Sequence, residues 1–184
     1  MSKTNNPHTD QVVAVPSDEV SNLKPPPAGK DGIQQRGLKI ERRFTTPESD
    51  PFDEIVWEMR DAAIYDEKGA VIFEQKGVEV PASWSQLATD IVSSKYFRKA
   101  GVPQVDQETS VRQLTRRVAR TIRQVGEAFG GYFASAKDAE SFEAELTHLL
   151  AYQYGAFNSP VWFNCGLWHE YGIEGGGGNY YWNM

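Results

Sequence analysis

An apolar stripe between residues 111 and 129 is the clearest pattern along the chain. Its members recur at spacings of three and four residues, which places them on one face of an α-helix. Gly130 and Gly131 follow directly, and glycine is typical of the position just after a helix. The pattern therefore predicts an amphipathic helix whose stripe consists of Val111, Leu114, Val118, Ile122, Val125 and Phe129.

Two further helices are expected on either side of this stripe. Ser83 with Gln86 three residues later matches a capping box, so one helix is expected to begin at Ser83. Its apolar face would consist of Trp84, Leu87, Ala88 and Ile91. The other helix is expected from near Asp138 to Gly155, with His148 as a structural residue. Its inward face would consist of Phe142, Leu146, Leu149 and Leu150.

Residues 61–81 follow a strand pattern instead. A turn signal at residues 66–69 separates two short apolar runs and predicts a hairpin. Gly77 and Pro81 bound a further short strand at residues 78–80. The order of elements is therefore a hairpin, three helices and an irregular segment rich in glycine and aromatic residues. This order predicts an α+β fold that is mainly helical, with a small β-hairpin.

The first 40 residues differ in composition from the rest. They contain no aromatic residue and include the run Pro25 to Pro27. Such a segment buries too little apolar area to offset the entropy lost on ordering. We therefore expect a disordered tail over residues 1–40 and one folded domain over residues 41–184.

Charge and cysteine content restrict the class of protein. The formal net charge of −6 argues against general binding to nucleic acid or anionic membranes. A single cysteine cannot form an intrachain disulfide, and the first ten residues lack the apolar core of a signal peptide. No run approaches the roughly 18 apolar residues of a membrane-spanning helix. These features predict a cytoplasmic protein that has neither a nucleic acid nor a membrane as its partner.

Five arginines occupy much of the remaining surface of the helix at residues 111–129. One interpretation is a solvated basic face, and the other is a surface that binds an anion or a partner. The arginines are Arg112, Arg116, Arg117, Arg120 and Arg123.

Candidate chemistry gathers near the end of the sequence. Pro160 restricts Ser159 toward extended geometry and predicts a tight turn, where the serine hydroxyl can donate to a phosphate or a sugar; a plain turn is the alternative. Four glycines at residues 175–178 lack the Lys and Ser/Thr of a P-loop, which favours a flexible loop. Cys165 and His169 would share one face of a helix, but a metal site needs more ligands, so a packed and inert cysteine is favoured.

Several stretches resemble the adenosylcobalamin-dependent (class II) ribonucleotide reductases. The most specific is FNSPVWFNCG at residues 157–166, followed by WHEYGIEGGGGNYYW at residues 168–182. The others are FEQKGVEVPASWSQLATDIVSSKYFRKAG, ETSVRQLTRRV and GGYFAS. Together they extend the resemblance over roughly residues 38–184.

This resemblance implies a ten-stranded α/β barrel preceded by a mainly helical N-terminal region. It implies reduction of ribonucleoside diphosphates by thiyl-radical chemistry, with adenosylcobalamin as cofactor and a thiol reductant such as thioredoxin. The full-length enzyme could form a homodimer. The serine of the NSP turn contacts the substrate in that family, which assigns substrate binding to Ser159. No catalytic residue and no metal ligand is carried over.

The chain departs from the family pattern in length and in cysteine content. It contains one cysteine, Cys165, and no segment that matches the barrel or the cobalamin site. We therefore expect an N-terminal fragment, truncated at the entrance to the barrel and inactive alone. The rival hypothesis is a free-standing helical interaction module that uses the arginine-rich helix face.

Overall fold

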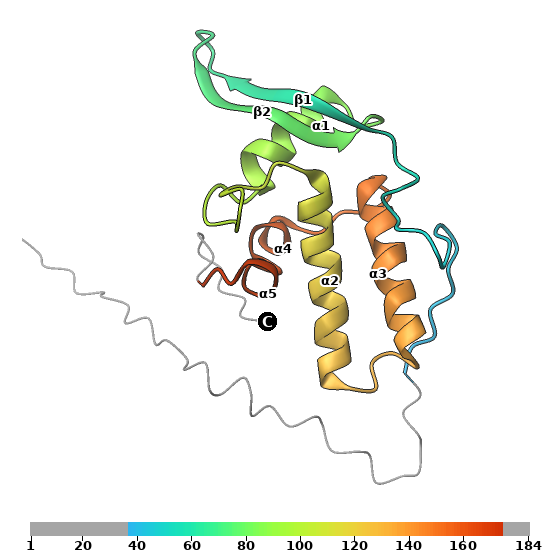
Figure 1. Ribbon diagram of the computed structural model, residues 1–184. Coiled ribbons are helices and arrows are strands. Elements are labelled where there is room, and N and C mark those ends of the chain that lie inside the picture. Colours follow the sequence, from blue (N-terminus) through green and yellow to red (C-terminus); the bar gives the residue numbers. More distant parts are fainter. Residues whose placement is uncertain (1–36, 175–184) are drawn as a thin grey trace, which may run out of the picture. The chain divides into compact units, whose positions relative to one another are not determined.

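The computed structural model describes residues 37–174, which form a two-stranded sheet and a series of helices (Figure 1). The sheet comes first in the chain, and the helices follow it. Most of the tail expected over residues 1–40 lies outside the described residues, as does the glycine run at residues 175–178. The order of hairpin and helices confirms the α+β class expected from the sequence.

The hairpin pairs β1 (Trp57–Tyr65) with β2 (Val71–Pro81) in antiparallel fashion. The turn lies where the sequence predicts it. Its first residue, Asp66, accepts a hydrogen bond through its carboxylate from the N–H of Ala70 at 2.8 Å. A short polar side chain thus closes the turn by bonding to the backbone.

The separate strand predicted for residues 78–80 is wrong, because these residues continue β2. Gly77 has a φ of +64°, which a residue with a Cβ rarely adopts. The pairing register shifts on the opposite strand between Arg60 and Ala62. Gly77 therefore lies in a bulge inside β2 and does not end a strand.

α1 (Gln86–Ile91) begins later than the sequence predicts. Ser85 caps it, since its hydroxyl accepts a hydrogen bond from the N–H of Ala88 at 3.1 Å. The cap predicted at Ser83 is wrong. Ser83 lies in a turn in which the N–H of Trp84 donates to the carbonyl of Pro81 at 3.0 Å, so the chain is not yet helical there.

The apolar residues of α1 do not face the core as a group. Leu87 is 67% exposed, whereas Thr89 is fully buried. The Thr89 hydroxyl accepts a hydrogen bond at 3.2 Å from the guanidinium of Arg60 on β1. A polar partner from the hairpin therefore lies against the inner face of α1, and Leu87 points to solvent.

α2 (Val111–Phe129) is the long helix that the apolar stripe predicts. Ser110 and Gln113 form a capping box at its start, and Gly130 ends it. The first half of the stripe is buried. Phe129 at its end is 48% exposed. The last turn of α2 lies at the end of the helix far from the hairpin (Figure 1).

α3 (Ala136–Ala151) runs antiparallel beside α2 (Figure 1). It ends four residues before Gly155, so the predicted end was wrong. Gln153 adopts a φ of +58° and makes the left-handed turn that was expected of a glycine. The N–H of Tyr154 then donates to the carbonyl of Leu149 at 2.9 Å, which satisfies one of the free carbonyls at the end of the helix.

Residues 37–40, at the end of the expected tail, are among the described residues. The N–H of Leu38 donates to the carbonyl of Tyr132 at 2.8 Å, and the carbonyl of Leu38 accepts from Ala134 at 2.9 Å. The N–H of Ile40 donates to the carboxylate of Asp138 at 2.8 Å. This segment therefore pairs with the loop between α2 and α3.

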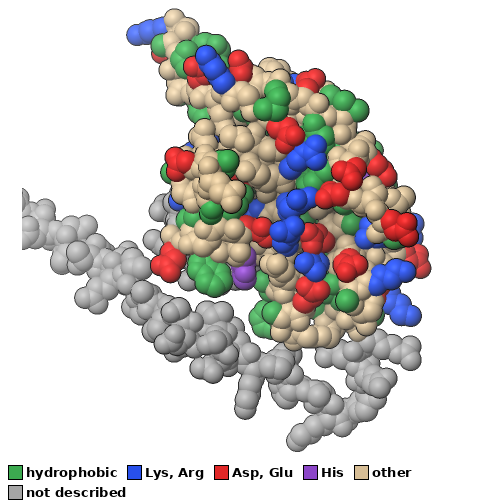
Figure 2. Space-filling model, viewed as in Figure 1, with side chains coloured by type: hydrophobic (Ala, Val, Ile, Leu, Met, Phe, Trp, Pro, Cys, Tyr) green, Lys and Arg blue, Asp and Glu red, His purple; other side chains and the backbone are tan. Residues whose placement is uncertain are grey.

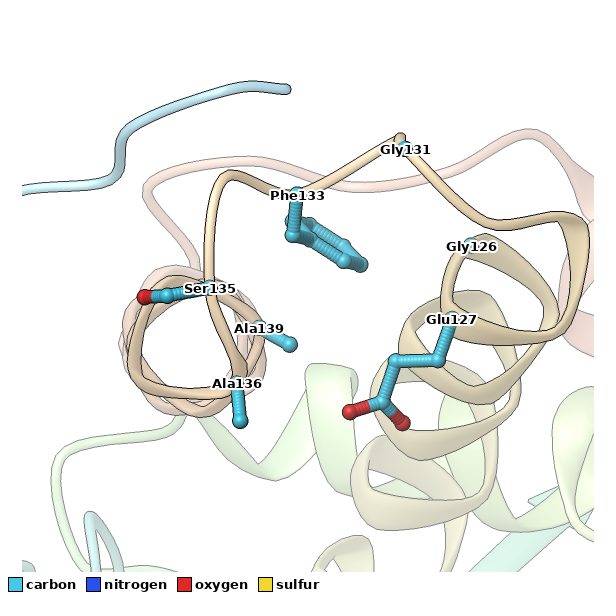
Figure 3. A pocket seen from close by; sticks show the side chains of 7 residues that line it. All are labelled: Gly126, Glu127, Gly131, Phe133, Ser135, Ala136 and Ala139. Carbon is cyan, nitrogen blue, oxygen red and sulfur yellow. The ribbon is translucent and has the colours of Figure 1, made fainter. Parts of the chain in front are cut away.

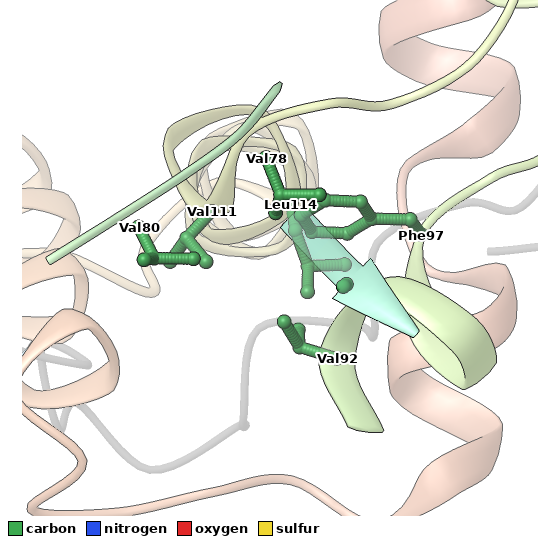
Figure 4. Packing of buried hydrophobic residues seen from close by; sticks show 7 residues of the cluster. Val78, Val80, Val92, Phe97, Val111 and Leu114 are labelled. Carbon is green, nitrogen blue, oxygen red and sulfur yellow. The ribbon is translucent and has the colours of Figure 1, made fainter. Parts of the chain in front are cut away.

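The main hydrophobic core lies where the hairpin meets the start of α2 (Figure 4). The third contributor is η2 (Val92–Tyr96), a π-helical turn that continues directly from α1. The core consists of Ala62, Val78, Val80, Val92, Phe97, Val111 and Leu114.

Two short helices follow α3 and lie beside α2 (Figure 1). They are α4 (Ser159–Asn164) and α5 (Leu167–Tyr171), so the segment expected to be irregular is largely helical up to residue 171. Within residues 37–174, no helix combines the length and the apolar character needed to cross a membrane.

Candidate functional site

Ser159 is the first residue of α4, and its side chain is half-buried. The tight turn predicted at Ser159 and Pro160 is instead the first turn of a helix. A proline is tolerated there, because the N–H groups of a first turn have no partner within the helix. The preceding residue, Asn158, takes the extended geometry that was expected of Ser159.

The Ser159 hydroxyl lies 3.2 Å from the hydroxyl of Tyr96, the last residue of η2. The Tyr96 ring packs against Phe163 of α4, with the ring centroids 5.4 Å apart. It also lies near Trp162, which in turn contacts Phe157 edge-on at 5.9 Å. The two hydroxyls therefore meet at the edge of an aromatic cluster that joins η2 to α4.

A buried ion pair lies beneath this cluster. The side chain of Arg117 on α2 is 1% exposed, and that of Glu108 is fully buried. The Nε of Arg117 donates to Glu108 at 2.8 Å. The same guanidinium donates to the carbonyl of Trp162 at 3.1 Å and to that of Cys165. Arg117 thus holds the end of the helix that carries Ser159.

The carboxylate of Glu108 is fully engaged by hydrogen bonds. It accepts from the N–H of Arg98 at 2.8 Å and from the hydroxyl of Tyr171 on α5 at 2.9 Å. Burial raises the pKa of Tyr171 well above its ordinary value, and the charge of Glu108 raises it further. Tyr171 is therefore a hydrogen-bond donor at neutral pH, as this arrangement requires.

Lys99 is a second cation beside this network. Burial of its ammonium lowers the pKa of Lys99 to about 8, and the nearby charge of Glu108 partly opposes the change. The residue as a whole remains exposed, and its ammonium lies 4.4 Å from the centre of the Phe73 ring. The ion pair of Glu108 is thus with Arg117, and Lys99 lies at its margin.

Gly166 allows the link between α4 and α5 to approach α2 closely. It has a φ of +82°, and a Cβ at this position would lie 2.5 Å from the Cγ of Arg117 and 2.6 Å from the Thr121 hydroxyl. A larger residue would therefore separate the two short helices from Arg117.

Cys165 and His169 do not share one helix face. Cys165 ends α4, Gly166 reverses the chain, and His169 belongs to α5. Burial raises the pKa of the Cys165 thiol, which favours the uncharged and unreactive form. Among residues 37–174, no group of three His, Cys, Asp or Glu side chains is placed to hold a metal ion.

His148 has the structural role that the sequence suggests. It is buried in α3, and its ring stacks on Tyr152 with the centroids 4.3 Å apart and on Phe44 at 5.1 Å. These contacts fix the segment before the hairpin against α3.

The arginines of α2 do not form an unpaired basic face. Basic and acidic side chains are interspersed over the face shown in Figure 2. The interpretation as a solvated basic face therefore holds only in part: four of the five arginine side chains remain 22–40% exposed, but each pairs with a carboxylate, and Arg117 is buried. The remaining ion pairs are Arg112 with Glu79, Arg116 with Asp50, Arg120 with Glu143 and Glu170, and Arg123 with Glu127 and Glu143.

A separate hollow lies between the end of α2 and the start of α3 (Figure 3). Its volume is about 280 Å³, and Phe133, Ala139 and the carboxylate of Glu127 line it. Ligand pockets for drug-sized molecules are roughly 300–1,000 Å³, so this hollow is small. It is also distant along the chain from Ser159.

Tyr96 and Glu108 were not predicted from the sequence, and Arg117 was predicted only as part of the basic face of the helix. A signal for Arg117 was present, since it lies three residues after Leu114 and directly before Val118, within the apolar stripe. A charged residue on the buried face of a helix needs a partner, so this position indicated an internal ion pair. Neither Tyr96 nor Glu108 had a comparable local signal.

Comparison with known proteins gives a consistent assignment. The family model for class II vitamin B12-dependent ribonucleotide reductase matches residues 58–153. A vitamin B12-dependent ribonucleotide reductase of Rhodopirellula baltica is 50% identical over 148 residues, which cover 80% of this chain. That of Streptomyces clavuligerus is 53% identical over 133 residues, or 71% of this chain. That of Agrobacterium fabrum is 36% identical over 177 residues.

The chain belongs to the class II vitamin B12-dependent ribonucleotide reductase family. It spans 14% of the length of each of these three relatives. The matched range contains Tyr96, Glu108 and Arg117, whereas Ser159 lies six residues beyond it.

Proposed function

We propose that this chain is the N-terminal part of a cobalamin-dependent ribonucleoside-diphosphate reductase, which supplies deoxyribonucleotides for DNA synthesis. Family membership and the small share of the relatives' length support this proposal. The rival, an interaction module that uses the arginines of α2, is less favoured. Those arginines already pair with carboxylates of the same chain.

Within that enzyme, Ser159 contacts the substrate. The observation that carries this assignment is the anchoring of α4 by Arg117, which fixes the helix at the carbonyls of Trp162 and Cys165. A fixed helix presents the half-buried Ser159 hydroxyl in one position. A hydroxyl held in place can donate to a phosphate or ribose oxygen with little further loss of entropy.

Cobalamin in its adenosyl form is the cofactor proposed for the whole enzyme, in which it supplies the radical. Residues 37–174 do not fit this cofactor. The hollow of about 280 Å³ beside Phe133 is far too small for a corrinoid, and these residues offer no cluster of metal ligands. We therefore assign no step of the reaction through cobalamin to this part of the chain.

Reduction of the ribose needs thiols that this chain does not supply. Replacing the 2′-hydroxyl by hydrogen consumes two electrons and releases water, and two thiols provide the electrons as they become a disulfide. The sequence contains one cysteine, and burial raises the pKa of its thiol. We therefore propose that the chain alone is inactive and that the other parts of the enzyme contribute the radical cysteine and the dithiol.

The same proposal extends to partners and location. A thiol protein such as thioredoxin would reduce the disulfide again, and the complete enzyme would work in the cytoplasm as a homodimer. Neither a nucleic acid nor a membrane is among the proposed partners.

Replacing Ser159 by alanine in the complete reductase tests the substrate contact. Loss of a hydrogen bond to a charged phosphate costs roughly 1.5–3 kcal/mol, so kcat/KM should fall about tenfold or more. The melting temperature should change little, because Ser159 contributes little to the core. Unchanged kinetics would reduce Ser159 to a structural residue of α4, and a large fall in melting temperature would have the same consequence.

A further inference from the structure

The hydroxyls of Tyr96 and Ser159 link η2 to α4. The buried core cluster contains Val92 and Phe97 beside Tyr96, and the Tyr96 ring packs both against this cluster and against Phe163, so the ring is a packing group. The Tyr96 hydroxyl instead reaches Ser159 across a separation of 63 residues in the chain, at 3.2 Å.

The π-helical turn η2 orients the Tyr96 side chain toward α4. The N–H of Phe97 donates to the carbonyl of Val92 five residues earlier, at 3.1 Å, which widens the last turn by one residue. A widened turn rotates the side chains that follow it, and such turns are frequent at functional sites. Here the rotation leaves Val92 and Phe97 buried while Tyr96 faces Ser159.

The chemistry of an anionic ligand fixes the direction of this hydrogen bond. A phosphate oxygen only accepts, so Ser159 must use its single proton to bind one. Its oxygen then accepts from a neighbour, and the Tyr96 hydroxyl is the donor at hydrogen-bond distance. Donation by Tyr96 also polarises the serine hydroxyl and strengthens its own donated bond.

We propose that Tyr96 is a positioning residue for the substrate contact: its hydroxyl donates to the Ser159 oxygen and directs the serine proton toward the nucleotide. This inference rests on the proposed substrate contact of Ser159 and adds a second residue to it. Tyr96 acts through Ser159 and does not itself touch the substrate.

Tyr96→Phe is the test, because it removes the hydroxyl and keeps the ring that packs on Phe163. It is made in the complete reductase together with Ser159→Ala and the double variant, with cytidine diphosphate as substrate. One neutral hydrogen bond corresponds to a factor of roughly 2–10 in affinity, so KM should rise about three- to tenfold with kcat unchanged. Tyr154→Phe is the matched control, since Tyr154 is an exposed tyrosine in a different aromatic cluster.

The double variant separates the two proposals. If Tyr96 acts through Ser159, adding Tyr96→Phe to Ser159→Ala should change KM less than about twofold, because the bond is already lost. Full additivity would overturn the inference while leaving the substrate contact of Ser159 in place. The inference would also be overturned if Tyr96→Phe left KM unchanged while Ser159→Ala lowered kcat/KM.

Two further outcomes also count against the inference. No kinetic effect of Ser159→Ala would overturn the substrate contact and the role of Tyr96 together. The melting temperature of Tyr96→Phe is measured in the complete reductase and in the 184-residue chain. A large fall in melting temperature in both, together with the higher KM, would make Tyr96 a packing residue.

Discussion

At the scale of single residues, the buried pair of Arg117 and Glu108 organises the region around Ser159. Its geometry satisfies both groups, since Glu108 also accepts from Arg98 and Tyr171 while Arg117 donates to two carbonyls. A buried pair that is broken on one side leaves an uncompensated charge, which costs roughly 3–5 kcal/mol. The pair is therefore essential to this region whether or not it adds net stability.

Arg117→Met should lower the free energy of unfolding of the 184-residue chain by about 3–5 kcal/mol, because Glu108 remains buried without its partner. Arg112→Met is the matched control on the same helix. Arg112 pairs with Glu79, both side chains are partly exposed, and its guanidinium lies 4.0 Å from the centre of the Trp57 ring, so about 1–2 kcal/mol should be lost. Urea unfolding gives both values, and similar losses for the two variants would contradict the role assigned to Arg117.

At the scale of elements, periodicity predicted α2 correctly, but the apolar face that it predicted for α1 was wrong because Leu87 is exposed, and the predicted boundaries of α1 and α3 rested on single residues. The stripe over residues 111–129 fixed α2, because six apolar positions agree on one face. The start of α1 at Ser83 and the end of α3 at Gly155 each relied on one residue. A turn at Trp84 and the left-handed Gln153 decided those boundaries, and neither has a clear sequence signal.

The candidate site, too, could be predicted from the sequence only in part. Ser159 could be proposed because it lies in a specific motif, but its helical setting could not, since α4 depends on carbonyl contacts made by Arg117. Tyr96 is 63 residues away in the chain, so no local pattern links the two hydroxyls. Long-range contacts of this kind follow only from the fold.

The two candidate caps of α1 allow a direct comparison. Ser85→Ala should destabilise the chain by about 1 kcal/mol, because the Ser85 hydroxyl accepts from the first turn of the helix. Ser83→Ala should change the free energy of unfolding by less than about 0.5 kcal/mol, as surface substitutions usually do. Chemical unfolding distinguishes them, and a larger effect at Ser83 would restore the original prediction of the cap.

Glu145 on α3 docks the segment before the hairpin. Its carboxylate accepts from the N–H groups of Arg43 and Thr45 at 3.0 and 2.9 Å and from the Thr45 hydroxyl at 2.6 Å. Burial alone would raise the pKa of Glu145, but these hydrogen bonds outweigh it and hold the pKa below its ordinary value of 4.5. The folded state therefore binds the Glu145 proton less readily than the unfolded chain does.

The stability that Glu145 contributes should be complete above pH 4.5 and lost as the pH falls through the lowered pKa of the folded state. The melting temperature of the wild type should exceed that of Glu145→Gln by a constant amount at neutral pH. This difference should shrink as the pH falls below 4.5. Glu140→Gln, at an exposed position on the same helix, is the control. A difference that grows in acid would contradict the assignment.

At the scale of the whole molecule, residues 37–174 form a folded segment of a class II ribonucleotide reductase family member. Its hairpin, α2 and η2 form the core; the buried Arg117 joins α4 to that core, and its partner Glu108 joins α5 through Tyr171. This construction explains why a segment that spans 14% of its relatives has a defined structure at Ser159. We propose that the chain supplies a contact for the substrate and that the thiols and the cofactor belong to the other parts of the enzyme.

The most direct test of this account is cobalamin-dependent reduction of cytidine diphosphate, measured with dithiothreitol for two proteins. One is the 184-residue chain alone. The other is the Rhodopirellula baltica reductase in which this chain replaces the matching 148 residues, which are 50% identical. We expect no turnover above a protein-free blank for the chain and adenosylcobalamin-dependent turnover for the chimera, with kcat/KM reduced about tenfold by Ser159→Ala. Turnover by the chain alone, or a folded chimera whose kcat/KM does not respond to Ser159→Ala, would contradict it.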